Sequence, residues 1–137
     1  MDVKLLRESF DLVAVNKQQF AQDFYNRLFN VCPQMQALFS ESDMQQQETA
    51  LMGAISGIIA GIEKGENIIP ALHKLGATHA SYNVLPEHYP LVGTALIETF
   101  QQHLQNKFTP VIQQSWLEAY SIISEQMILG AKRARQK

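Results

Sequence analysis

Four histidines are the residues of this 137-residue chain best suited to bind a metal or to move a proton. His73 lies one step off an apolar helix face, His88 lies in the first turn of a helix, and His103 lies among glutamines. We interpret these three as surface or rim residues. His79 differs, because it follows Leu75 by four residues and therefore shares the inward face of a helix.

An inward histidine is more often a buried core residue than a ligand, and on the residues alone that interpretation stays open. A single imidazole is too little for zinc, which takes three or four protein ligands. It is enough for a haem iron, because the porphyrin supplies the in-plane ligands. The pattern around His79 therefore allows a haem site without requiring one.

Two polar residues are further candidates for the interior. Tyr25 lies within an apolar helix, in the run from Phe24 to Phe29, and Gln47 lies one turn before Leu51. Taken singly, each has a simpler interpretation. Tyr25 is then a core tyrosine whose hydroxyl reaches the surface, and Gln47 is a solvated glutamine.

Other catalytic chemistry has little to use in this sequence. It contains no Gly-x-Ser-x-Gly motif, no phosphate-binding glycine loop and no His-Glu-x-x-His motif. Its single cysteine, Cys32, precedes a proline between apolar helices and is interpreted as a buried structural thiol. One thiol excludes an internal disulfide framework and a cysteine-rich metal site, and it is compatible with a reducing cytosol.

Helical periodicity runs through nearly the whole chain, and strand-like alternation is nowhere sustained. It predicts an all-α protein of about seven helices. They are expected to include residues 5–13, 20–29, 34–39, 43–62, 72–79, 86–104 and 110–133. Asn16, Asp43 and Thr109 are the expected capping residues, because their side chains can accept hydrogen bonds from the first free N–H groups of a helix.

Three glycines follow one another at four-residue intervals within the expected helix 43–62. They are Gly53, Gly57 and Gly61, and in a helix they lie on one side. Each glycine costs about 1 kcal/mol of helix propensity relative to alanine. A packing reason is therefore favoured, and we expect another helix to cross closely on this side.

Length and charge limit the kind of protein and its partners. With 46% hydrophobic residues the chain can build one core, so we expect a single domain over residues 1–137. A net charge of −2 gives no electrostatic basis for nucleic-acid binding. The start of the chain is charged where a signal peptide is apolar, and the longest apolar stretch is shorter than the ~20 residues of a bilayer span. We expect a cytoplasmic monomer or weak homodimer that binds no membrane.

Taken together, these residues resemble the globin family over residues 5–131. The stretches that carry the resemblance are 24–29, 33, 38–39, 75–79, 84–93, Trp116 and Tyr120. Two runs, Phe-Tyr-Asn-Arg-Leu-Phe and Pro-Glu-His-Tyr-Pro-Leu-Val-Gly, are similar to the branch of flavohaemoglobins and bacterial single-domain haemoglobins. The resemblance implies a globin fold, with about seven helices packed around a haem pocket.

The resemblance also implies the residues of that pocket. His79 matches the proximal iron ligand, and Phe39 matches the phenylalanine that packs against the haem. Tyr25 and Gln47 match the distal hydrogen-bond donors, with Gln46 as the alternative to Gln47 because the loop after Phe39 is short. The remaining expected pocket residues are Leu51, Ile55, Leu75, Val84, Val92 and Tyr89, the last matching a tyrosine beside the proximal histidine.

The implied cofactor is haem b, since no Cys-x-x-Cys-His motif offers covalent attachment. The implied ligands are dioxygen, bound reversibly for storage, transport or delivery, and the other diatomic gases NO and CO. Nitric oxide dioxygenase activity would need an external reductase. Arg133 stands where flavohaemoglobins carry a glutamate that partners the proximal tyrosine and histidine, which argues against strong peroxidase-like or dioxygenase activation. A gas or redox sensor and a haem-free interaction module remain the alternatives.

Overall fold

Helices make up all the regular secondary structure of residues 2–136, the part of the chain that the computed structural model describes. Met1 and Lys137, which belong to the expected domain, lie outside the described residues. The described helices are α1 (Val3–Ala14), α2 (Lys17–Val31), α3 (Pro33–Gln36), α4 (Met44–Glu63), α5 (Ile69–Ser81), α6 (Tyr89–Leu104) and α7 (Pro110–Arg135). Short 3-10 turns lie at Ala37–Phe39, Pro86–His88 and Gln105–Lys107. The predicted all-α architecture of about seven helices is confirmed.

Two of the three expected capping residues act through their side chains. Asp43 accepts hydrogen bonds from the N–H groups of Gln45 and Gln46, and Thr109 accepts one from Ile112. The prediction for Asn16 is only half right. It occupies the capping position of α2, but its side chain forms no capping bond, because its backbone departs from the extended conformation that aims such a side chain at the helix.

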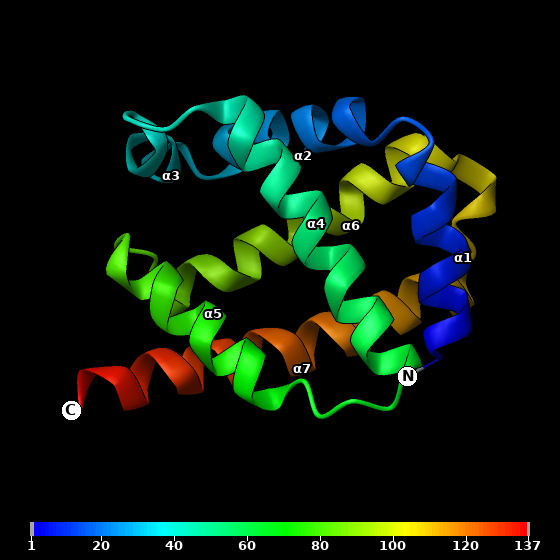
Figure 1. Ribbon diagram of the computed structural model, residues 1–137. Coiled ribbons are helices and arrows are strands. Elements are labelled where there is room, and N and C mark those ends of the chain that lie inside the picture. The colour runs from blue at the N-terminus through cyan, green and yellow to red at the C-terminus, as the bar shows by residue number, and fades with distance from the viewer. Residues whose placement is uncertain (1, 137) are drawn as a thin grey trace.

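The helices pack in pairs around the region of the candidate site. Helix α4 crosses in front of α6, α2 lies along one edge, and α5 lies beside α7 (Figure 1). An aromatic core joins them: the ring of Phe100 lies 4.9 Å from Phe20 and 4.5 Å from Trp116 between centroids. The indole N–H of Trp116 donates to the buried hydroxyl of Ser9, which ties α7 to α1.

The close helix crossing lies elsewhere than the glycine pattern predicted. Gly53 and Gly57 are exposed, and a β-carbon at either position would meet nothing within 4 Å. Gly61 meets only the side chains of Ile68 and Glu66. The prediction of a packed glycine stripe is therefore wrong, because the face of α4 that carries Gly53 and Gly57 points to solvent.

The real crossing is between α5 and α7, where two glycines let the backbones touch. A β-carbon at Gly76 would overlap the backbone of Met127, and one at Gly130 would overlap the backbone of His73. This contact presses α5 onto α7 and sets the position of the residues one turn beyond Gly76, among them His79.

Candidate functional site

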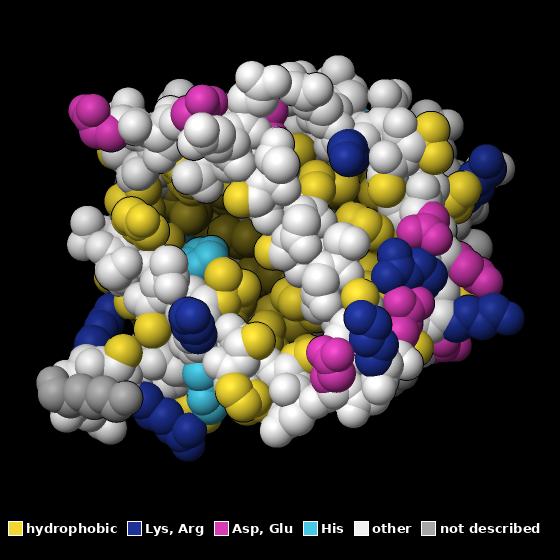
Figure 2. Space-filling view, in the orientation of Figure 1, with side chains coloured by type: hydrophobic (Ala, Val, Ile, Leu, Met, Phe, Trp, Pro, Cys, Tyr) yellow, Lys and Arg dark blue, Asp and Glu magenta, His cyan; other side chains and the backbone are white. Residues whose placement is uncertain are grey.

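An apolar cavity of about 280 Å³ opens between α2, α4, α5, α6 and α7. In the space-filling view it is a hollow walled by hydrophobic side chains (Figure 2). None of the described residues that line it is an aspartate, glutamate, lysine or arginine. The wall therefore offers an apolar environment with a few uncharged polar groups, which is typical of small-molecule and cofactor sites.

The structure brings all ten residues expected at a haem pocket to the wall of this one cavity. They are Tyr25, Phe39, Gln47, Leu51, Ile55, Leu75, His79, Val84, Tyr89 and Val92. Gln46, the alternative to Gln47, is exposed and does not line the cavity. Contact between these residues and a haem remains a prediction.

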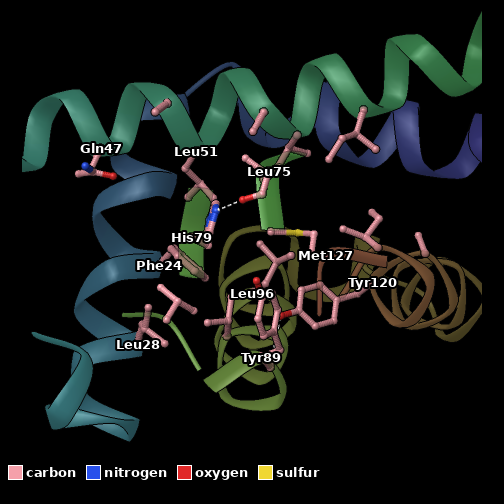
Figure 3. A pocket seen from close by; sticks show the side chains of 18 of the residues that line it. Phe24, Leu28, Gln47, Leu51, Leu75, His79, Tyr89, Leu96, Tyr120 and Met127 are labelled. Atoms are coloured by element: carbon pink, nitrogen blue, oxygen red, sulfur yellow. Dashed lines mark hydrogen bonds between the residues drawn. The ribbon is translucent and has the colours of Figure 1, made fainter. Parts of the chain in front are cut away.

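His79 reaches the cavity from the last turn of α5, half-buried (Figure 3). Its Nδ1 lies 2.8 Å from the backbone carbonyl oxygen of Leu75. Because a carbonyl oxygen only accepts, this hydrogen bond places a proton on Nδ1, so Nε2 is the ring nitrogen available to a metal. A neutral imidazole with one free nitrogen, oriented by a backbone acceptor, is the usual form of a metal-ligating histidine.

The other three histidines lie away from the cavity, as expected. Nε2 of His73 donates to the side-chain oxygen of Gln126, and Nδ1 of His88 accepts from the backbone N–H of Leu85. The interpretation of His103 as a solvated residue is wrong. It packs against Phe20 and lies 2.7 Å from the Asp23 carboxylate, because α2 and α6 lie side by side there.

Tyr25 is a residue of α2 whose hydroxyl lies next to α4, and only 8% of the residue is exposed. Its hydroxyl donates to the backbone carbonyl of Gln47 across 3.5 Å, a long and weak bond. Burial, with the charge of Glu48, raises the pKa of the Tyr25 phenol to about 12, so the hydroxyl keeps its proton at neutral pH. Its ring is held by an edge contact with Phe39.

One pair of tyrosines, Tyr89 and Tyr120, lies on the α6 and α7 side of the cavity (Figure 3). The Tyr120 hydroxyl donates to the backbone carbonyl of Tyr89 across 2.6 Å, and the absence of a side chain at Gly93 makes room for the Tyr120 ring. Burial raises the pKa of both phenols. Arg133, further along α7, is exposed and does not line the cavity.

Sequence reasoning missed several residues of the wall. Tyr120, Ile123 and Met127 of α7 line the cavity, as do Ala50, Ala54 and Ile58 of α4. The α7 residues recur at helical spacing after Trp116, so their shared face was visible in the sequence. What the spacing did not show is that this face borders the cavity and not the solid core.

A bundle of helices around an apolar cavity with one histidine in its wall is the arrangement found in the class of α-helical haem proteins that hold the iron through a histidine. Comparison with known sequences gives the family. The Globin family pattern matches residues 22–127, which is most of the chain, and the chain belongs to the globin family. Membership supports haem as the cofactor and diatomic gases as ligands.

Individual relatives agree with this assignment. The chain is 30% identical over 128 residues to a flavohemoprotein of Bacillus subtilis, covering 92% of this chain and 32% of that protein. It is also 30% identical over 130 residues to flavohemoprotein A of Dictyostelium discoideum, covering 92% of this chain and 32% of that protein. The chain therefore spans about a third of the length of the flavohemoproteins it matches.

Among solved structures, a bacterial globin from Campylobacter jejuni superposes with a TM-score of 0.84 and 26% identity, over 98% of this chain and 97% of that one. The expected globin fold is confirmed. Within residues 2–136, no helix combines the length and the apolar character needed to cross a membrane.

Proposed function

We propose that this chain is a single globin domain over residues 1–137 that holds haem b through His79 and binds dioxygen reversibly, for storage, transport or delivery. The observation that carries the proposal is the His79 imidazole in an uncharged cavity wall, with Nδ1 on the Leu75 carbonyl and Nε2 free. When bound, haem supplies an iron that takes a diatomic gas as its remaining ligand.

The chain's own residues have separate roles in this proposal. Aliphatic side chains of α4, α5 and α6 exclude water from the cavity, which strengthens any hydrogen bond formed inside it. Phe39 holds one side of the pocket and contacts the Tyr25 ring. Tyr25 and Gln47 line the cavity, and in this proposal they are the two donors that stabilise a gas ligand that takes on negative charge.

The partner of His79 favours reversible binding over stronger activation. Its Nδ1–H donates a hydrogen bond to a neutral backbone carbonyl. A carboxylate acceptor would attract that proton more strongly and make the imidazole more electron-donating. The cavity wall contains no carboxylate among the described residues, and Arg133 is exposed.

The first test is the absorbance of the purified protein after haem is added. We expect a Soret band and, in the ferrous state, a five-coordinate high-spin spectrum, because His79 is the only histidine among the described residues lining the cavity. His79→Ala is expected to lose haem or to need added imidazole, while His73→Ala, which lies away from the cavity, keeps it. A normal histidine-type ferrous spectrum in His79→Ala would overturn the assignment.

A second candidate function is nitric oxide dioxygenation, and the flavohemoprotein relatives favour it. Their name joins a flavin to a haem, and this chain matches about a third of their length. Joining nitric oxide and dioxygen to give nitrate consumes an electron, so a separate reductase would have to supply it. Nitrate yield from NO, with and without an added flavin reductase, tests this. If each protein molecule forms no more than one nitrate and no added reductase increases the yield, reversible oxygen binding remains the proposed function.

Two further outcomes separate the remaining alternatives. A folded protein that takes up no haem would be a haem-free interaction module. A haem protein that binds gas but whose binding to a separate protein changes with the gas would be a sensor. Titration with haem followed by gas-dependent pull-down distinguishes these two from the oxygen-binding proposal.

A further inference from the structure

Positive and negative charges are separated on the surface around the cavity. Residues 67–86, which include α5, and residues 126–136 at the end of α7 contain four lysines and arginines and no aspartate or glutamate. Residues 40–48, which lead into α4, contain three acidic residues and no lysine or arginine. Figure 2 shows dark blue side chains below the hollow, over α5 and the end of α7, and magenta ones above it.

Four exposed cations make up what we call the basic face: Lys74 of α5, and Lys132, Arg133 and Arg135 of α7. The close crossing of the two helices brings them to one side of the molecule. A β-carbon at Gly130 would overlap the backbone of His73, the residue before Lys74. The last turn of α7 therefore begins beside the middle of α5.

The basic face is charge without a counter-charge. Within residues 2–136 none of its four cations forms an ion pair, whereas Arg7 and Arg27 bridge helices through Glu63 and Glu98. The cations of α7 also suit the negative end of that helix's dipole. Lys74 lies in the interior of α5, where no helix end favours a cation, so the dipole does not explain the whole face.

The basic face adjoins the part of the cavity that holds the proposed iron ligand. Lys74 directly precedes Leu75, whose side chain lines the cavity and whose carbonyl accepts from Nδ1 of His79. A protein bound to this face would lie against the helix that carries His79. The α2 and α4 side of the cavity, with Tyr25 and Gln47, would stay uncovered for a gas ligand.

We propose that the basic face is the docking site of an acidic protein that carries a reduced flavin and reduces the haem iron. The inference rests on the proposed function, because an iron that has become ferric has to be reduced before it binds dioxygen again. One electron passes to the iron of each chain. A reduced flavin carries two electrons, so it reduces two chains in turn and releases its protons to water.

Electrostatics favours a partner of limited size on this side of the molecule. Opposite charge steers an acidic protein to α5, and the acidic residues 40–48 repel it from the α4 side. With a net charge of −2, the whole chain offers little to an extended polyanion such as nucleic acid or an anionic membrane. A small, salt-sensitive contact is typical of transient electron-transfer complexes.

The first test is the rate at which the ferric, haem-loaded protein is reduced by a strongly acidic flavodoxin that has been reduced beforehand. The test variant removes the three α7 charges together: Lys132→Gln, Arg133→Gln and Arg135→Gln. We expect the second-order rate constant to fall about ten- to thirtyfold at low salt, and its dependence on salt to become shallower. Lys74→Gln alone should lower it by about threefold.

The matched control removes three exposed cations from other parts of the surface: Lys4→Gln, Lys17→Gln and Lys107→Gln. It changes the net charge by the same amount as the α7 variant, so it separates the effect of the basic face from that of overall charge. We expect its rate constant to stay within about twofold of the wild type. All the substituted side chains are exposed, so every variant should keep the wild-type Soret band.

A second readout measures docking without electron transfer. Oxidised flavodoxin is titrated into the carbon monoxide form of the protein, and backbone amide shifts are followed by NMR. We expect shifts in α5 and in residues 126–136, none in residues 40–48, and their loss when salt is raised.

The inference is overturned if the α7 variant and the control are reduced equally fast, or if the amide shifts lie outside α5 and the end of α7. It is also overturned if vesicles of phosphatidylserine and phosphatidylcholine bind through the four cations while flavodoxin does not, since the partner would then be a membrane. Failure of the proposed function is a different result: the wild-type chain would show no Soret band, although flavodoxin would still shift the same amides.

Discussion

Gly76 of α5 lies directly against the backbone of Met127 on α7, with no room for a β-carbon between them. The contact fixes how closely α5 approaches α7 three residues before His79 in the chain. A small residue at this point therefore matters more to the cavity than any of the glycines of α4.

Gly76→Ala is expected to destabilise the protein by about 2–3 kcal/mol, because a methyl group would force the two backbones apart. Gly57→Ala is the matched control. It adds the same methyl group in an exposed helix with nothing nearby, and we expect it to stabilise by about 0.5–1 kcal/mol. Urea unfolding of both variants measures the two changes. A neutral Gly76→Ala would show that the crossing can widen freely.

Tyr25→Phe is expected to raise the oxygen dissociation rate by roughly ten- to a hundredfold, equivalent to about 1.4–2.8 kcal/mol. The ring stays packed on Phe39 and only the donor is lost. Gln47→Leu should do less, because the half-buried glutamine loses more side-chain freedom when it donates. Stopped-flow measurement with oxygen and carbon monoxide distinguishes the causes. Equal effects on both gases would mean that the residues act by shape, since bound carbon monoxide carries little negative charge.

The buried tyrosines predict a loss of stability at alkaline pH. The unfolded chain releases the Tyr25 proton near the ordinary pKa of 10.0, whereas the folded protein keeps it to about 12. The stability that the protonated Tyr25 phenol contributes is therefore fully present below about pH 10. It falls by about 1.4 kcal/mol per pH unit as the pH rises from about 10 to about 12. Tyr25→Phe should make this decline shallower, which denaturant unfolding at several alkaline pH values would measure. An unchanged slope would contradict the raised pKa.

Ser9→Ala is expected to cost about 1–3 kcal/mol of stability, because it leaves the buried indole N–H of Trp116 without an acceptor. The Ser9 hydroxyl also donates to the backbone carbonyl of Leu5. The substitution therefore removes one hydrogen bond within α1 and one between α1 and α7. Ser124→Ala serves as control, since that hydroxyl bonds only to the backbone of its own helix. Thermal unfolding of the two variants compares them, and equal melting temperatures would show that the indole finds another partner.

The sequence determined the elements and much of the candidate site. Apolar spacing predicted the helices, because each side chain's direction on a helix follows from its position in the chain. The same rule placed His79 with Leu75 and Gln47 with Leu51. Resemblance to globins added the expected roles, and the ten named residues do meet at one cavity.

Only the tertiary structure decided which faces meet. Gly53 and Gly57 looked like a packing stripe, yet Gly76 and Gly130 make the close contact, because burial depends on the partner helix and not on local spacing. His103 looked solvated in a glutamine-rich segment, yet α2 packs beside it and its Nε2 lies 2.7 Å from the Asp23 carboxylate. Local pattern fixes the direction of a side chain along its helix, whereas the free energy of burial is decided by residues far away in the chain.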